Sequence, residues 1–206
     1  MNKYIIRKGI KEDSKIIAEV FSIAGGDAIR WVFGKNYEKI LKDITKLKIN
    51  PFSYSVSFII ERNDEIAGAV VTYPYKIEQK LLGKLDSIWK RHFNTFGLIS
   101  FIKRAEKWDK NFKKTMNSQY IHALAIFKEY RGLGLAGKLL DHVEKMAIKN
   151  GLSEIALEVI SDNTSAIRAY NKFGFKRIKT VPLIKLSRSF RGEDRVIFIM
   201  QKNITH

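Results

Sequence analysis

A glycine-rich stretch between a strand-like run and an amphipathic run constrains this sequence more than any other feature. The apolar run 120–127 precedes it, and apolar residues at helical spacing follow over 135–149. A strand, a tight turn and a helix in this order point the free N–H groups and the dipole of the helix at an anion. Glycine lacks the Cβ that would keep a phosphate away from the main chain, and arginine adds a fixed positive charge. The sequence therefore predicts a phosphate-binding turn made of Arg131, Gly132, Leu133, Gly134, Leu135, Ala136 and Gly137.

Other interpretations of this turn have to be compared. A nicotinamide-binding fold also uses Gly-x-Gly-x-x-Gly, with an acidic residue about 20 residues further on, and Glu154 and Glu158 lie in that range. However, the pattern comes late in the chain, and too little sequence follows it for a doubly wound sheet. No Gly-Lys-Ser/Thr ending is present, which excludes a P-loop. A glycine turn that only starts a helix is the remaining alternative.

The segment that follows has a second characteristic pattern. Residues 153–161 are typical of a strand, and Asp162-Asn163-Thr164-Ser165 supplies the side chains that cap a helix N-terminus. A short helix is predicted over 166–173, and Gly174 stands where a helix commonly ends.

Taken together, the two segments resemble the GNAT superfamily of acetyl-CoA-dependent N-acetyltransferases. The first half of that family's signature, Arg/Gln-x-x-Gly-x-Gly/Ala, is present as Arg131, Gly134 and Ala136. The second half is an asparagine, a tyrosine seven residues later and a Gly-Phe pair, here Asn163, Tyr170, Gly174 and Phe175. The match runs from about residue 120 to residue 178, with both halves in the family's order and separation.

The pattern of elements predicts one α/β (α+β) domain over 1–206. Strand-like and helical runs alternate as β-α-α-β-β-(helical insert)-β-α-β-α-β-β, which indicates a mixed sheet with helices on both faces. The resemblance implies that this sheet is mostly antiparallel. An insert at about 76–118, between the third and fourth strands, has apolar residues at helical spacing and predicts two helices with a break near 94–97. In relatives, this region and the first helical region, here 25–34, border the acceptor site.

The resemblance also implies roles for particular residues. The main chain of the fourth strand, at Leu124, Ala125 and Ile126, would hold the pantetheine arm and stabilise the oxyanion. The turn 131–137 would hold the pyrophosphate of acetyl-CoA, which is the co-substrate. Asn163 would contact the CoA arm, and Tyr170 would be the general acid beside the thioester sulfur. A packed aromatic residue is the alternative for Tyr170.

Two residues are candidates for the general base. Glu158 lies twelve residues before Tyr170, as in the ribosomal-protein N-terminal acetyltransferases of this superfamily. His122 occupies the fourth-strand position where polyamine-acetylating relatives carry a glutamate, and an imidazole titrates near neutrality. The ordinary structural alternative for His122 is a buried, hydrogen-bonded histidine, and solvent itself is a third source of the base.

Composition restricts the chemistry further. The 206 residues include no cysteine, which excludes disulfides and a cysteine-based acetyl-enzyme, so direct transfer in a ternary complex is expected. The four histidines lack metal-ligand spacing, and no metal is expected. Without an apolar run of membrane length or a signal-peptide pattern, the expected location is cytoplasmic.

The formal net charge of +17 raises the question of a polyanionic partner. The basic segment 103–114, with Trp108 and Phe112 among its lysines, is compatible with nucleic-acid binding or with the outer face of an amphipathic helix. The expected acceptor is a small-molecule amine or a peptide or protein amine. A catalytically silent CoA-binding regulatory module and a basic nucleic-acid-binding protein are the alternative functions. The apolar part of the insert suggests a homodimer contact.

Overall fold

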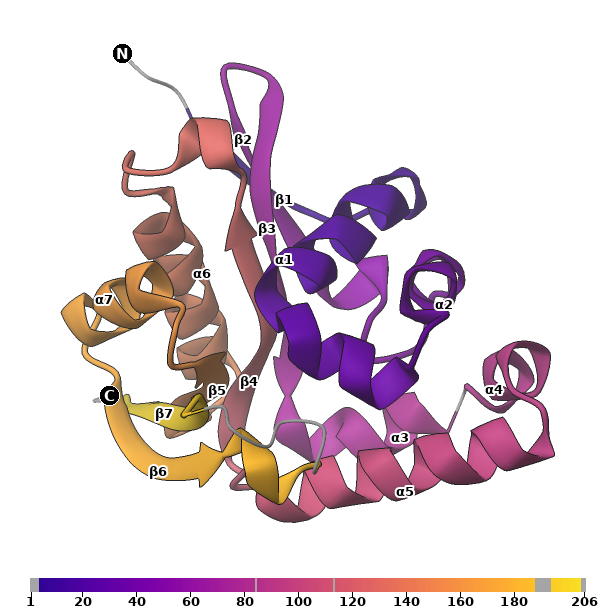
Figure 1. Cartoon of the computed structure of the whole chain (residues 1–206). Helices are drawn as coiled ribbons and strands as arrows, with labels where there is room; N and C mark the ends of the chain where they lie inside the picture. Colours follow the sequence, from indigo (N-terminus) through magenta and orange to yellow (C-terminus); the bar gives the residue numbers. More distant parts are fainter. Residues whose placement is uncertain (1–3, 84, 113, 188–193, 205–206) are drawn as a thin grey trace.

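The computed structural model of the chain describes residues 4–83, 85–112, 114–187 and 194–204. Helices and strands alternate along the chain as the sequence pattern predicts (Figure 1). In chain order they are β1 (Tyr4–Lys8), α1 (Ser14–Phe33), α2 (Tyr37–Ile44), β2 (Ser57–Arg62), β3 (Glu65–Pro74), α3 (Glu78–Leu82), α4 (Asp86–His92), α5 (Thr95–Asn111), β4 (Ser118–Ile126), α6 (Leu135–Lys149), β5 (Glu154–Ile160), α7 (Thr164–Lys172), β6 (Lys176–Pro182) and β7 (Val196–Asn203).

The strands form one seven-stranded sheet in the order β1-β2-β3-β4-β5-β7-β6. Neighbouring strands run antiparallel except for β4 and β5, which pair in parallel. The expected mixed, mostly antiparallel sheet is therefore confirmed. The parallel pair at its centre is the pair that α6 connects, because a parallel connection needs a crossover.

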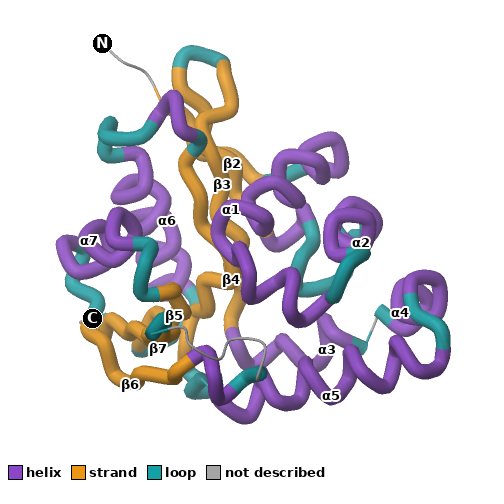
Figure 2. The backbone as a smooth tube through the Cα atoms, viewed as in Figure 1, coloured by secondary structure: helices purple, strands orange, loops and turns teal. Residues whose placement is uncertain are grey.

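Helices cover both faces of the sheet. In Figure 2, α6 and α7 lie on one side of the strands, and α1 and α2 lie on the other. Neighbouring side chains of β2 point to opposite faces of the sheet and so pack against different helices. Ile60 packs in the cluster that contains Leu139 and Val143 of α6, whereas Ile59 packs in the cluster that contains Phe21 of α1.

The insert between β3 and β4 forms three helices, α3, α4 and α5, and not the two that the spacing of apolar residues predicts. The expected break near residue 94 is present, because Asn94 caps α5 by accepting a hydrogen bond from the N–H of Gly97 (2.8 Å). An additional break follows α3, which ends at Gly83, a residue of low helix propensity. The long α5 runs along the edge of the molecule below α1 and α3 in Figure 1.

Within the described ranges, no helix is both long enough and apolar enough to cross a membrane. The same ranges contain no group of three or more His, Cys, Asp or Glu side chains arranged to hold a metal ion.

Candidate active site

The two central strands separate where the site begins. The pairing of β4 with β5 ends at Ile121 and Leu157, although both strands continue beyond these residues. On its other side, β4 has a register shift: Ile121 pairs with Thr72 and Ala123 pairs with Val71, so His122 is an extra residue. An extra residue of this kind bends and twists its strand. The bulge at His122 therefore coincides with the point where β4 leaves β5.

The separation leaves main-chain groups of β4 unpaired on the side of β5. The N–H of Phe127 donates to the carbonyl of Ala67 on β3 (2.9 Å), and successive residues of a strand point their main-chain groups to opposite edges. Leu124 and Ile126 therefore face the open edge, while the main chain of Ala125 faces β3. The carbonyl of Ile126 accepts a hydrogen bond from Nε of Arg131 (3.1 Å) across this edge.

The glycine-rich turn lies at the end of this opening. Gly132 and Gly134 have φ angles of 78° and 77°, in the left-handed region that favours glycine. The first three N–H groups of α6, from Leu135 to Gly137, precede its first internal hydrogen bond, which Lys138 donates to the carbonyl of Gly134 (3.3 Å). A Cβ added to Gly132, Gly134 or Gly137 would meet no atom within 4 Å. The glycines thus leave open space next to the first N–H groups of α6, which fits a bound pyrophosphate.

A small cavity of about 40 Å³ lies between the separated strands. Tyr170 and Asn163 line it together with Leu124, Glu158 and His122. The Tyr170 side chain is buried, its ring lies 5.6 Å from that of Phe175, and burial raises its pKa to about 12. Its hydroxyl makes no hydrogen bond to another described residue, so it is available to donate. The predicted Asn163, Tyr170, Glu158 and His122 therefore meet at one place.

Asn163 also has a structural role. It is the N-cap of α7, and its Oδ1 accepts hydrogen bonds from the N–H of Ala166 (3.2 Å) and from the hydroxyl of Ser165 (3.1 Å). Its amide nitrogen is not used by these contacts.

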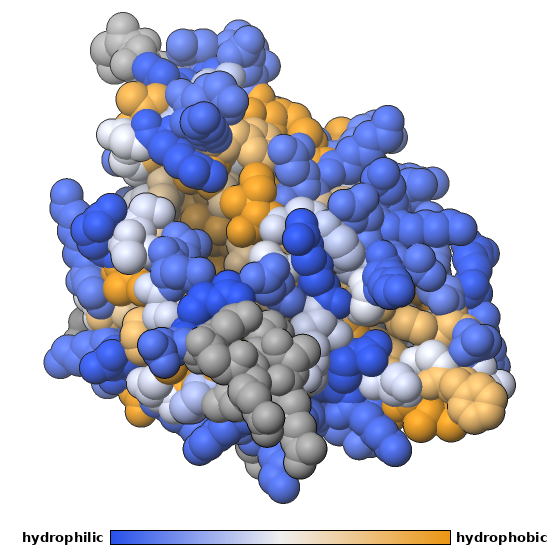
Figure 3. All heavy atoms as spheres, in the orientation of Figure 1, coloured by the Kyte–Doolittle hydropathy of each residue, from blue (hydrophilic) through white to orange (hydrophobic). Residues whose placement is uncertain are grey.

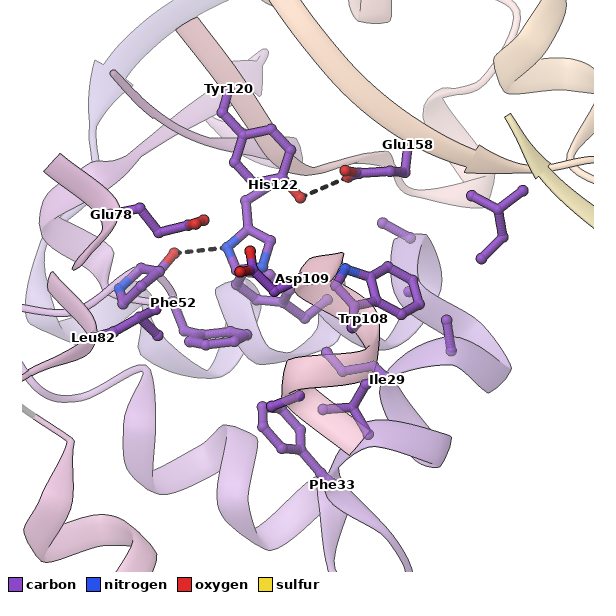
Figure 4. A pocket seen from close by; sticks show the side chains of 18 of the residues that line it. Ile29, Phe33, Phe52, Glu78, Leu82, Trp108, Asp109, Tyr120, His122 and Glu158 are labelled. Carbon is purple, nitrogen blue, oxygen red and sulfur yellow. Dashed lines mark hydrogen bonds between the residues drawn. The ribbon is translucent and has the colours of Figure 1, made fainter. Parts of the chain in front are cut away.

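Glu158 is held by two residues that sequence analysis did not assign to the site. Tyr120 donates a hydrogen bond from its hydroxyl to Glu158 Oε2 (2.7 Å), as Figure 4 shows. Lys114 Nζ lies 2.7 Å from Glu158 Oε1, as an ion pair rather than a well-directed hydrogen bond. The ammonium of Lys114 also lies 4.0 Å above the ring of Tyr120. With side chains only 5% and 8% exposed, Lys114 and Glu158 form a buried pair.

His122 is neutral and oriented. Its Nδ1 lies 3.0 Å from the carbonyl of Pro51, and because a carbonyl only accepts, Nδ1 carries the hydrogen and Nε2 is left without one. The rings of Phe21 and Phe52 flank the imidazole, with centroids 4.9 Å and 4.6 Å away. Burial lowers its pKa to about 4. The expected alternative of a buried, hydrogen-bonded histidine is thus present, yet His122 also lines the cavity.

A larger cavity of about 370 Å³ continues from the small one, and both share Ala24, His122, Glu158 and Val159. Its walls come from α1 and from all three helices of the insert, the two segments expected to border the acceptor site. Gly26, with φ 43° and ψ −129°, interrupts α1 next to the lining residues Ala24, Gly25 and Ala28. In Figure 3, which has the orientation of Figure 1, an orange and tan hollow opens over the central strands, between the side of α6 and α7 and the side of α1.

Of the two aromatic residues in the basic segment 103–114, Phe112 is buried and Trp108 is only partly exposed. Phe112 is fully buried, Trp108 lines the large cavity, and Lys114 is the buried partner of Glu158. Arg104 donates from Nε to the carbonyl of Val32 (2.9 Å). Base stacking on Trp108 and Phe112 is therefore no longer an argument for nucleic-acid binding, and such binding stays a prediction based on charge alone.

Comparisons with known proteins agree with this geometry. The sequence model of the "Acetyltransferase (GNAT) family" matches residues 27–175. Among the similar curated proteins is N-alpha-acetyltransferase 30 of Schizosaccharomyces pombe, which is 38% identical over 84 residues, or 41% of this chain. Another is N-alpha-acetyltransferase 50 of Danio rerio, which is 44% identical over 62 residues, or 30% of this chain. The chain spans only 53% and 37% of the length of these two relatives.

A solved structure is similar over nearly its whole length. An N-acetyltransferase from Staphylococcus aureus Mu50 superimposes with a TM-score of 0.66, covering 96% of this chain and 99% of the other, at 17% identity. At this low identity, the likeness shows a common fold.

Proposed function

Because this chain belongs to the acetyltransferase (GNAT) family, we propose that it transfers an acetyl group from acetyl-CoA to a primary amine, directly and within a ternary complex. The observation that carries the proposal is the opening between β4 and β5, which joins the glycine-rich turn at one end to the large cavity at the other. We treat residues 1–206 as one domain that contains this whole site. The cytoplasm remains the expected location.

The turn and the open strand edge fit acetyl-CoA. The N–H groups of Leu135, Ala136 and Gly137 stand at the start of α6 and would bind the pyrophosphate, with Arg131 anchored beside them on Ile126. Asn163 would use its free amide nitrogen toward the CoA arm. Bound in this way, acetyl-CoA supplies an activated acetyl group as a thioester.

The remaining residues would stabilise the negative charge on the acetyl oxygen and transfer the protons of the reaction. The N–H of Leu124 or Ile126 would donate to the carbonyl oxygen of the acetyl group as negative charge develops there. The amine nitrogen forms a bond to the acetyl carbon, the bond from carbon to sulfur breaks, and the amine gives up one proton. Glu158 would accept that proton, with His122 Nε2 as the alternative acceptor. Tyr170 would donate a proton to the leaving thiolate.

Initial-rate kinetics test this proposal directly. Acetyl-CoA and the amine are varied together while the release of free CoA is followed, and calorimetry measures acetyl-CoA binding separately. We expect micromolar binding and double-reciprocal lines that intersect. Parallel lines would contradict direct transfer, whereas binding without CoA release in the presence of any amine would instead favour a silent CoA-binding module.

A further inference from the structure

The charge of the large cavity is opposite to that of the whole chain. The chain carries a formal charge of +17. Four carboxylates nevertheless line this cavity, from Glu78, Glu106, Asp109 and Glu158, and the only Lys or Arg among its described lining residues is Lys114. His122 is neutral, so four carboxylates and one ammonium are the ionisable groups of the described lining residues; Glu106 and Asp109 are exposed to solvent.

Three of these carboxylates gather at the end of the cavity near β4 and β5. Figure 4 shows Glu78, Asp109 and Glu158 around His122. Lys114 pairs with Glu158, while Glu78 accepts a hydrogen bond from the hydroxyl of Tyr73 (2.8 Å), and burial raises its pKa. Among the described residues, no cation forms an ion pair with Glu78 or Asp109. The charge of Lys114 also acts on Glu78, and Asp109 is exposed. Three carboxylates around a single ammonium still favour the binding of a second cation.

The opposite end of the cavity is apolar. Its walls are side chains of α1 and of the insert helices α4 and α5, and Figure 4 shows Ile29 and Phe33 on this side, away from the carboxylates. They belong to the apolar cluster formed by Ile29, Val32, Phe33, Trp89, Phe101 and Ala105. A charged or amide group placed here would lose its hydrogen bonds to water without replacement.

These two ends define the acceptor. We propose that it is a small primary amine with a single positive charge and an apolar body, either aromatic or branched aliphatic, and without a carboxylate. The inference rests on the proposed acetyl transfer and adds the class of amine. The ammonium binds at Glu78 and Asp109, beside Glu158, and releases one proton to solvent before the neutral amine attacks the acetyl carbon. The apolar body lies between α1 and α5. A cavity of about 370 Å³ is large enough for such a molecule.

The same features disfavour other amines. A polyamine would place its second ammonium against Phe33 and Phe101. The one carboxylate that lines the cavity outside the group at β4 and β5 is Glu106 among the described residues, and it is exposed to solvent. The carboxylate of a free amino acid would lie among Glu78, Asp109 and Glu158. A peptide entering by its N-terminus would bring amide groups into the apolar end, where they would stay unpaired.

A panel of four acceptors tests the proposal on the full chain: phenethylamine, spermidine, phenylalanine and a short peptide with an N-terminal phenylalanine. Calorimetry measures binding without acetyl-CoA, and mass spectrometry measures acetylated product with it. We expect phenethylamine to bind at least tenfold more tightly than the other three and to have the highest kcat/KM. Preference for spermidine, phenylalanine or the peptide would overturn the inference and leave the acetyltransferase proposal standing. Tight phenethylamine binding without any acetylation would contradict the acetyltransferase proposal and leave the class of amine that the cavity binds standing.

Matched variants on α5 locate the bound amine. Ala105→Leu fills the apolar end, whereas Ser100→Leu adds the same side chain at an exposed position of the same helix that does not line the cavity. We expect Ala105→Leu to weaken phenethylamine binding at least tenfold, and Ser100→Leu to leave it within twofold. Asp109→Asn, at an exposed position, should weaken it several-fold and serves if Ala105→Leu fails to fold. Binding unchanged in both Ala105→Leu and Asp109→Asn would overturn the proposed location.

Discussion

At the scale of single residues, Tyr170 combines a buried ring with a free hydroxyl. Because burial raises its pKa to about 12, it keeps its proton throughout the physiological range and can act as an acid. Tyr170→Phe should lower turnover by about 10²-fold, a typical contribution of general acid catalysis. Acetyl-CoA binding should stay within about twofold by calorimetry, because the ring remains. Tyr37→Phe, at a hydroxyl bonded to Glu38 outside the site, is the control, and unchanged turnover in Tyr170→Phe would remove this residue from the reaction.

His122 should make the protein sensitive to acid. Its pKa falls from 6.5 to about 4 on folding, so the unfolded chain binds the proton more readily between these values. Lowering the pH through this window therefore favours unfolding, by at most about 3 kcal/mol. His122→Asn keeps a donor for the carbonyl of Pro51 but does not titrate. Urea unfolding from pH 7 to pH 4 should show a flatter loss of stability in this variant, and an equal slope in both proteins would contradict the assignment.

The contributions of Lys114 and Glu158 to the free energy of unfolding are expected to depend on each other. Lys114→Met leaves the buried Glu158 carboxylate without its counter-charge and should cost about 3 kcal/mol of unfolding free energy. Adding Glu158→Gln removes that charge and keeps an acceptor for Tyr120, so the double variant should recover most of the loss. Urea denaturation of Lys114→Met, Glu158→Gln and the double variant measures this coupling. Additive losses would mean that the pair does not interact in solution.

At the scale of elements, Asn163 connects the stability of α7 with the site. Asn163→Ser retains the cap, whereas Asn163→Ala removes it and should cost about 1 kcal/mol. If the amide nitrogen binds the CoA arm, both variants should lose affinity for acetyl-CoA by a similar factor, although only the alanine variant loses stability. Thermal unfolding and calorimetry separate the two effects, and full affinity in Asn163→Ser would limit Asn163 to its capping role.

The elements of the site differ in how far sequence predicts them. The turn at Gly132 and Gly134 and the cap at Asn163 follow from local patterns, because a left-handed turn and a helix start depend on neighbouring residues. The bulge at His122 depends on the register with β3, which no local pattern contains. Tyr120 and Glu158 are 38 residues apart in the sequence, so their hydrogen bond has no local signal. Lys114, which pairs with Glu158, stands in the sequence at the end of a basic segment and is not distinguished from its other lysines. Contacts of this kind arise only when the sheet and the insert are assembled.

At the scale of the whole molecule, net charge does not predict the charge of a cavity. Lysines on solvated faces set the total of +17, while the large cavity draws most of its ionisable groups from the few positions where α3, α5 and β5 meet. The basic composition alone would have argued against a cationic acceptor. The basic surface should therefore attract acetyl-CoA and repel a cationic amine, whereas the carboxylates of the cavity should attract that amine.

Salt should separate these two effects. The positive surface attracts the phosphates of acetyl-CoA from a distance and repels a free amine, and added salt screens both interactions beyond about 8 Å at physiological ionic strength. Between about 20 and about 300 mM NaCl, chosen to span roughly a fifteenfold range of ionic strength, the KM for acetyl-CoA should rise several-fold. The KM for phenethylamine should stay constant or fall, because repulsion by the surface weakens while its contacts with Glu78 and Glu158 lie inside the cavity, where screening is smaller. A parallel rise in both KM values would show that the amine approaches by the attraction of an acidic surface, which the charge distribution of this chain does not provide.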